Sequence, residues 1–138
     1  MDTHQISSVF LHGMAFQSNI NGHTIITDTT TDGGGNNEGP SPKRLMLASL
    51  AGCTGIDVVS ILNKMKVTFS DLSIDVSAGL TEEHPKIYRD VLITYKIKVD
   101  EADKPKMEKA VKLSKERYCG VSAMFSAFST VESNIIYL

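Results

Sequence analysis

The chain has 138 residues, a formal net charge of −2, 41% apolar residues and 22% charged residues. This composition is ordinary for a folded protein, so we expect residues 1–138 to form a single domain. The small net charge excludes a broad basic field for nucleic acid or an anionic membrane. Neither a run of 18 apolar residues nor a basic leader before an apolar block occurs, so no membrane span and no secretory signal are expected, and a cytoplasmic location is favoured.

The first forty residues are predicted to hold short strands and then a polar loop. Apolar residues are spread among polar ones over residues 5–28, and Asn21-Gly22 is a strong signal for a hairpin turn. Residues 29–40 are polar and rich in glycine and asparagine, which predicts a mobile loop. A phosphate-binding loop is disfavoured because the Gly-Lys-Ser/Thr ending of such loops is absent.

A long apolar helix is predicted over residues 42–66. Ser41 suits the N-cap of this helix and Pro42 its first helical position, and no further proline interrupts the run. Residues 48–59 are apolar on most sides of the helix. This pattern is typical of a helix that is buried in a core or at a subunit interface.

The rest of the chain is predicted to add two strands, two helices and a last strand. Alternation of apolar and polar residues indicates strands over residues 72–78 and 91–99. A helix begins near Asp103, a short helix follows over 121–128, and a strand covers 130–138. Helices grouped apart from hairpins predict an α+β fold with an antiparallel sheet. The stripe of the first of these helices that we expect to be buried is Met107, Ala110, Val111 and Ser114.

The two cysteines, Cys53 and Cys119, are the main functional candidates, and two are too few for a disulfide scaffold. Cys53 lies between Gly52 and Gly55 inside the predicted long helix. Because each glycine costs about 1 kcal/mol in a helix interior, this pair suggests that another element or a substrate approaches the backbone closely. A helix crossing that buries an inert cysteine explains the same pattern.

Local charges favour Cys119 over Cys53 as the more easily ionised thiol. Asp57 follows Cys53 by one helical turn and disfavours a negative charge on it, unless Asp57 faces a cation such as Arg117 or a lysine. Cys119 is predicted to stand where one helix ends and another begins, and N–H groups there stabilise a thiolate. Arg117 adds positive potential beside it, and Glu116 opposes that effect.

No local metal site or hydrolase site is predicted. The cysteines lie far apart in the sequence, which excludes a Cys-x-x-Cys motif, and a zinc site would need further ligands at short spacing. The four histidines are scattered, and nothing in the sequence brings one to either cysteine, as a cysteine hydrolase requires. We therefore expect no metal and no cofactor.

Two segments carry a resemblance to a known family. Residues 39–53, Gly-Pro-Ser-Pro-Lys-Arg-Leu-Met-Leu-Ala-Ser-Leu-Ala-Gly-Cys, resemble the central-helix signature of the OsmC/Ohr superfamily, the osmotically induced and organic-hydroperoxide-resistance proteins. Residues 118–122, Tyr-Cys-Gly-Val-Ser, resemble its second signature. Residues 57–59 and His84-Pro85 are similar to the OsmC-like branch. The predicted order of elements also fits, so the resemblance covers essentially the whole chain.

The resemblance implies an α+β, OsmC-like fold in which antiparallel sheets wrap the long central helices of an intertwined homodimer. It also implies thiol-dependent reduction of organic or hydrogen peroxides. In that scheme the thiolate of Cys53 attacks the peroxide, the resulting sulfenic acid condenses with Cys119, and a dithiol reductant resets the pair. The implied partners are a second copy of the chain, a small peroxide and a dithiol, without nucleic acid or membrane.

Two positions depart from the pattern of the peroxide-reducing members. Those members carry an Arg in the N-terminal strands or in the loop after them, and a Glu directly after the proline that opens the helix. Here no Arg precedes Arg44, and Lys43 occupies the position of the Glu. These departures favour an alternative, a non-catalytic or weakly active OsmC-like protein that binds an apolar ligand or senses redox state.

Overall fold

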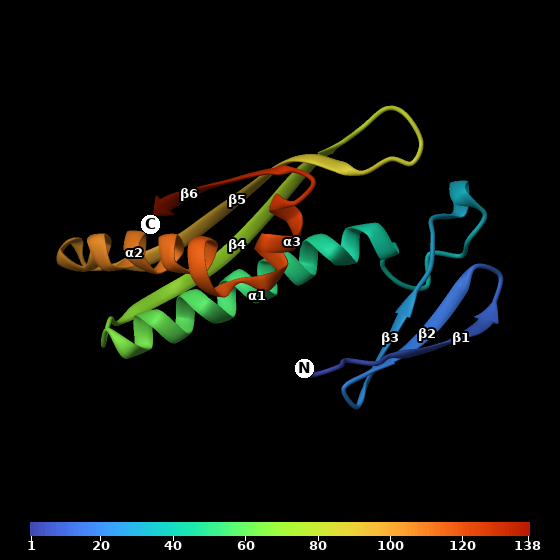
Figure 1. Cartoon of the computed structure of the whole chain (residues 1–138), viewed down its shortest axis with the longest axis horizontal. Coiled ribbons are helices and arrows are strands. Elements are labelled where there is room, and N and C mark those ends of the chain that lie inside the picture. The colour runs from blue at the N-terminus through green and yellow to red at the C-terminus, as the bar shows by residue number, and fades with distance from the viewer. The chain divides into compact units, whose positions relative to one another are not determined.

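The computed structural model describes all residues, 1–138, and the chain divides into two compact units, residues 1–46 and residues 47–138. Figure 1 shows the order of the elements along the chain. The mixture of helices and strands confirms the predicted α+β class. Each unit is described below by itself, and the single domain over residues 1–138 stays a prediction.

The first unit contains a three-stranded antiparallel sheet. Strand β1, Ser7–His12, pairs with β2, Ala15–Ile20, which in turn pairs with β3, His23–Thr27. The predicted hairpin turn is confirmed, because Asn21 and Gly22 separate β2 from β3 with positive φ angles of 52° and 81°. Two positive φ angles are the mark of a type I′ turn, whose twist matches that of the strands it joins.

Asp28 organises the glycine-rich loop after β3. Its buried carboxylate accepts the backbone N–H groups of Thr29, Asn36 and Glu38 at 2.7, 3.2 and 3.1 Å. These hydrogen bonds, first of all that from Glu38, hold the pKa of Asp28 below its usual value. A short 3-10 helix, η1, Thr31–Gly33, lies within the loop. The segment predicted to be a mobile loop is thus folded around one carboxylate.

The second unit contains a sheet with the strand order β4-β5-β6. Strand β4, Phe69–Leu80, runs antiparallel to β5, Tyr88–Val99, whereas β6, Thr130–Tyr137, runs parallel to β5. The sequence predicts an antiparallel sheet throughout, so the direction of β6 is a difference. Its cause is the long helical connection between β5 and β6, which returns the chain to the end where β5 begins and so makes the two strands parallel.

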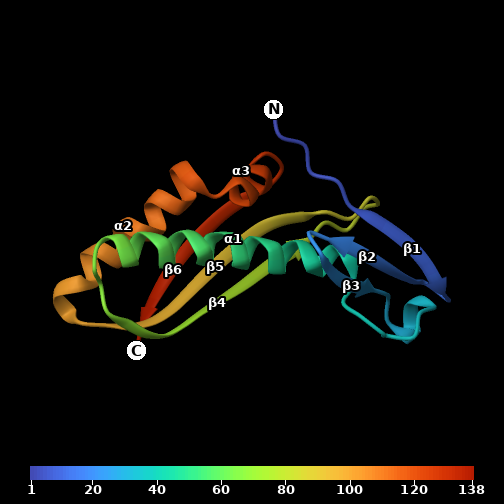
Figure 2. The same ribbon diagram turned by 90° about the horizontal axis from the view of Figure 1, so that it is seen from below.

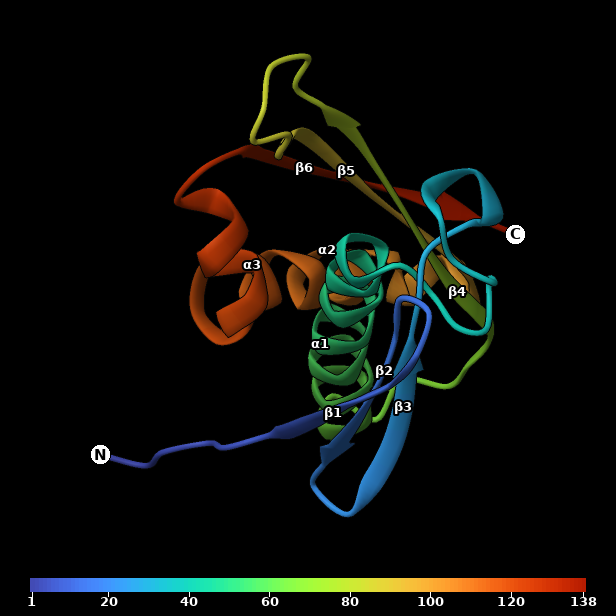
Figure 3. The same ribbon diagram turned by 90° about the vertical axis from the view of Figure 1, so that its right-hand side faces the viewer.

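Helices cover one face of this sheet, as Figures 2 and 3 show for the second unit. The long helix α1, Pro42–Lys64, precedes the sheet, and α2, Lys104–Leu113, follows β5 after a 3-10 turn, η2, Glu101–Asp103. A π-helical turn, η3, Ser114–Tyr118, then leads into α3, Gly120–Ser126. The predicted stripe of α2 is confirmed, because all four of its residues are buried: Met107, Ala110, Val111 and Ser114.

One line of side chains attaches α1 to the rest of the second unit. Leu50, Thr54, Val58 and Leu62 follow one another at intervals of four residues, and each is at most 1% exposed. Residues four apart share a helix face, so this line faces the core formed with β5 and α2. The hydroxyl of Thr54 fits the apolar line because it donates to the carbonyl oxygen of Leu50 at 3.0 Å.

By its length and composition α1 would also be apolar enough to cross a membrane, although the sequence lacks an unbroken apolar run. The core helix of a folded protein passes the same test. The buried line just described attaches α1 to the core of the second unit along one face.

Another face of α1 is apolar and open. Ala48, Gly52 and Ile56 are exposed, and the side chain of Ile56 is 73% exposed. Helices that are apolar on a face they do not bury in their own fold commonly bury it in an interface. We therefore expect α1 to pack against a second copy of the chain.

We predict that the protein sediments as a homodimer at micromolar concentration. The change Ile56→Asp should shift the protein toward monomer, because an unpaired carboxylate at the expected interface would have to be desolvated. Lys112→Asp, on the exposed side of α2, is the control and should leave the dimer intact. Sedimentation velocity decides between the outcomes, and a wild-type monomer would contradict the expectation.

Candidate functional site

Cys119 lies at the junction of two helical segments, as predicted. The π-helical turn closes with a hydrogen bond from the Cys119 N–H to the carbonyl oxygen of Ser114 at 2.8 Å, and Cys119 then serves as the N-cap of α3. Its Sγ accepts the backbone N–H of Ser122 at 3.2 Å. Turns of this wider type are frequent at functional sites. Here the turn directs a cysteine into the core.

The expectation that Cys119 is the more easily ionised thiol is wrong. Its side chain is 3% exposed, and burial, followed by the hydrogen bond with Cys53, raises the pKa of Cys119 from 9.0 to about 12. The N–H of Ser122 acts in the opposite direction but does not compensate. Burial disfavours the charged thiolate more than one N–H at a helix start stabilises it, so Cys119 stays a thiol at neutral pH.

The fold brings Cys53 and Cys119 together from separate helices. The two Sγ atoms and a carboxylate oxygen of Asp57 all lie within 4.8 Å of one another. Both cysteines are free, Cys53 partly exposed and Cys119 buried. We call Cys53, Asp57 and Cys119 the thiol cluster. Cys53 and Asp57 share one face of α1, one turn apart, and Cys119 approaches that face from the start of α3.

The two glycines beside Cys53 have different roles. A Cβ atom on Gly55 would lie 3.0 Å from the Cδ1 of Ile74 in β4, so Gly55 allows the close approach of α1 to the sheet. A Cβ atom on Gly52 would meet nothing within 4 Å, and Gly52 is exposed. The expected close approach is therefore found at Gly55, whereas Gly52 leaves open space beside Cys53.

Asp57 has a hydroxyl partner rather than a cation. The Oγ of Ser114 donates to Oδ2 of Asp57 at 2.9 Å, and Ser114 itself is fully buried. The proposed partner Arg117 instead stacks over the ring of Tyr118, 5.9 Å from its centroid. Asp57 therefore adds a carboxylate to the thiol cluster that is held in place by a buried serine and forms no salt bridge.

Tyr95 on β5 forms the inner wall of the site. It is 2% exposed, and burial raises its pKa, with further contributions from the nearby Cys119 and Asp57, while a hydrogen bond with Thr54 lowers it. The sequence shows Tyr95 only as one member of an alternating strand, so no local signal marks it as a neighbour of the cysteines.

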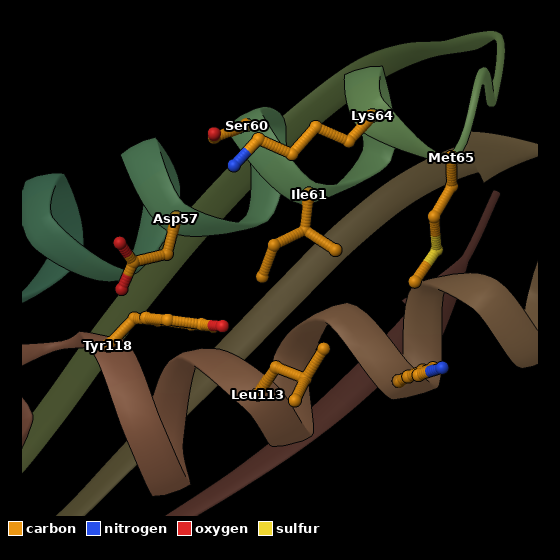
Figure 4. Close-up of a pocket in the computed structure, with 8 residues that line it drawn as sticks. Asp57, Ser60, Ile61, Lys64, Met65, Leu113 and Tyr118 are labelled. Atoms are coloured by element: carbon orange, nitrogen blue, oxygen red, sulfur yellow. The ribbon is translucent and has the colours of Figure 1, made fainter.

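A groove of about 470 Å³ opens beside the thiol cluster, between α1 and the α2–η3 segment. Figure 4 shows Asp57, Ile61 and Lys64 on the α1 side and Leu113 and Tyr118 opposite them. Ser60, Met65 and Lys109 complete the lining. The groove thus combines apolar walls with two lysines, and Asp57 belongs both to the groove and to the thiol cluster.

The sequence model of the OsmC-like protein family matches residues 34–134, a segment that contains all three members of the thiol cluster. The chain belongs to the OsmC-like family. This assignment confirms the resemblance that the two signature segments indicate. It also agrees with the long helix that carries Cys53 and with the helical junction that carries Cys119.

Relatives match this OsmC-like protein over most of its length. Protein YhfA of Escherichia coli strain K12 is 29% identical over 116 residues, which cover 83% of this chain and 84% of YhfA. A hypothetical protein of Aquifex aeolicus is 29% identical and has a TM-score of 0.82, with 100% of this chain and 99% of that chain covered. An organic hydroperoxide resistance protein OsmC of Legionella pneumophila shares the fold, with a TM-score of 0.69, 15% identity and coverage of 98% and 97%.

We predict that iodoacetamide modifies Cys53 at least about tenfold faster than Cys119 near neutral pH. Thiolates are the reactive species, and Cys119 is both buried and kept protonated by its raised pKa. Its rate should keep rising as the pH approaches that pKa. Mass spectrometry of the two cysteine peptides over time provides the rates, and the unfolded protein in urea is the control, in which the two rates should converge. Equal rates in the folded protein would contradict the geometry.

Proposed function

We propose that this OsmC-like protein reduces organic or hydrogen peroxides with Cys53 and Cys119 as a reacting pair. The observation that carries the proposal is the approach of the two free thiols to within 4.8 Å although they lie on separate helices. The name of the structural relative in Legionella, an organic hydroperoxide resistance protein, agrees with this chemistry. This chemistry fits a redox and stress-response role. It also fits the cytoplasm, where a thiol pair is kept reduced between cycles.

Cys53 is the peroxide-attacking residue in this proposal. It is partly exposed, with open space at Gly52 beside it, whereas Cys119 is 3% exposed. The raised pKa keeps Cys119 a thiol while Cys53 reacts with the peroxide, which leaves Cys119 for the second step, in which it supplies the second sulfur atom. Burial thus divides the two roles between chemically identical side chains.

The cycle has three steps. The thiolate of Cys53 attacks one peroxide oxygen, the O–O bond breaks, and the leaving alkoxide takes up a proton to become an alcohol, or water from hydrogen peroxide. The sulfenic acid on Cys53 then condenses with the thiol of Cys119, which forms a disulfide and releases water. A dithiol reductant finally exchanges with this disulfide, so that the reductant is oxidised and both thiols return.

The charges at the site imply a slow first step. The carboxylate of Asp57 lies within 4.8 Å of both sulfur atoms, and no salt bridge neutralises it. A like charge at this distance disfavours the attacking thiolate. The two departures from the peroxide-reducing pattern also favour a slow first step. The early Arg is absent, and Lys43 stands where the pattern has a Glu.

A second candidate function is ligand binding in the groove beside Asp57. The specific observation is the lining, which offers apolar side chains from Ile61, Met65 and Leu113 together with the ammonium groups of Lys64 and Lys109. Such a lining suits an apolar molecule with an anionic end. Under this alternative the cysteines report redox state without turning over peroxide.

We predict that peroxide consumption in the presence of a dithiol requires Cys53. Cys53→Ser should abolish it, because a hydroxyl does not replace the thiolate as nucleophile. Cys119→Ser should lose the internal disulfide, so that the sulfenic acid on Cys53 reacts directly with the dithiol or with more peroxide, and turnover should be slower and inactivate faster than in wild type. Measurement of peroxide loss, with circular dichroism to confirm that both variants fold, separates the two roles.

The disulfide itself distinguishes the two candidate functions. After brief treatment with hydrogen peroxide, wild-type protein should yield a Cys53–Cys119 cross-linked peptide, because the sulfur atoms need to close from within 4.8 Å to a bond of about 2.05 Å. Peptides that contain only unmodified or sulfinic cysteine would exclude the two-cysteine cycle and favour ligand binding in the groove.

We also predict that Asp57→Asn increases the rate of the peroxide reaction. Replacement of the carboxylate by a neutral amide removes the like charge and keeps the size of the side chain, so the gain should be about tenfold. Asp90→Asn, at an exposed position on β5, makes the same change of charge outside the cluster and is the control. A rate for Asp57→Asn equal to or below that of wild type would show that the carboxylate does not restrain the thiolate.

A further inference from the structure

The thiol cluster has the composition of a metal site. It offers two sulfur ligands and one carboxylate oxygen, all within 4.8 Å of one another. We propose that in the reduced protein Cys53, Asp57 and Cys119 bind one zinc ion. The inference goes beyond peroxide reduction and does not require it, because it concerns the reduced thiols in the absence of any peroxide.

The separations of the ligand atoms suit a small tetrahedral ion. Zinc–sulfur bonds of about 2.3 Å place two sulfur ligands of a tetrahedron about 3.8 Å apart. Because the two sulfur atoms lie within 4.8 Å of each other, they need to approach by at most about 1 Å. Cys53 and Asp57 are both only partly buried, so their side chains have room to rotate about their bonds.

The type of ligand selects the metal. Thiolates favour zinc and copper(I) over magnesium and calcium, which prefer sites made of oxygen. Two thiolates with one carboxylate and a remaining open position match the three-ligand pattern of accessible zinc sites. Asp57 also lines the groove, so the groove offers a route by which the ion and a fourth ligand reach the cluster.

Hydrogen bonds already orient two of the three ligands. Ser114 donates to Oδ2 of Asp57 at 2.9 Å, which leaves Oδ1 available, and the Ser122 N–H donates to Sγ of Cys119 at 3.2 Å. Outer hydrogen bonds of this kind typically hold metal ligands in position. Ser122 also carries the one buried side-chain hydroxyl without a hydrogen-bond partner, in the same turn as that sulfur.

Zinc binding exchanges the thiol protons for the metal ion. Zn²⁺ displaces one proton from each thiol, two protons enter the solvent, and the ion with two thiolates and one carboxylate carries one net negative charge. Disulfide formation consumes both thiolates, so the oxidised pair cannot hold the ion. Asp57 therefore has opposite effects on peroxide reduction and on zinc binding. It repels a free thiolate, but it helps to bind a cation.

Cobalt and zinc titrations of the metal-free, reduced protein test the proposal. Co²⁺ should produce intense thiolate-to-metal absorption in the near ultraviolet, together with visible bands of tetrahedral geometry, and saturate at one ion per chain. One equivalent of Zn²⁺ per chain should displace the Co²⁺ and abolish these absorption bands. Competition with a coloured chelator then gives the zinc affinity of wild type and of each variant.

The variants separate a built site from chance binding. Cys53→Ser and Cys119→Ser should each lower zinc affinity by at least about a hundredfold, because each removes a thiolate ligand. Asp57→Asn and Ser114→Ala should lower it by about tenfold or more, since one is a ligand and the other orients that ligand. Asp90→Asn is the matched control and should bind zinc as wild type does.

Two results would overturn the proposal. One is a wild-type protein without thiolate-to-cobalt absorption, and the other is an Asp57→Asn variant that binds zinc as tightly as wild type. The metal titrations and the peroxide experiments give independent results. The peroxide experiments oxidise metal-free protein, whereas the metal titrations contain no oxidant. Zinc binding without peroxide turnover supports the metal site alone, and a peroxide-formed disulfide without zinc binding refutes it.

Discussion

The position of α1 on the sheet determines the geometry of the whole site. Its buried line, Leu50 to Leu62, fixes the rotation of the helix about its axis, and Gly55 lets the helix approach β4. That rotation turns Cys53 and Asp57 toward the start of α3, where the π-helical turn has placed Cys119. Loss of either constraint would separate the two thiols although both side chains remained.

Packing that brings the thiols together also controls their chemistry. Burial protects Cys119 and raises its pKa to about 12, whereas Cys53 stays partly exposed. Asp57, oriented by the buried Ser114, adds a carboxylate within 4.8 Å of both sulfur atoms. A free thiolate is disfavoured in these surroundings, but a cation that draws on all three groups is favoured. In the two proposals the same cysteines therefore have two states, one open to oxidants and one closed by a metal ion.

The sequence predicts the elements well because their causes are local. Apolar periodicity locates the long helix and the stripe of α2, and Asn21-Gly22 locates the hairpin. Three features depend on contacts between distant residues and were not predictable in this way. The parallel direction of β6 depends on how the helices return the chain, the Ser114–Asp57 hydrogen bond joins residues 57 positions apart, and the ionisation of Cys119 depends on burial that nearby residues do not reveal.

The central claim is that folding alone pairs Cys53 with Cys119, before any oxidant or metal is added. Phenylarsine oxide tests it most directly, because its arsenic atom condenses stably with two adjacent thiols, with loss of water, and holds single thiols poorly. Native mass spectrometry of the reduced protein should show one phenylarsenic group per chain, and none in Cys53→Ser or Cys119→Ser. A wild-type chain that remains unmodified, with both thiols still free to react after unfolding, would contradict the pairing.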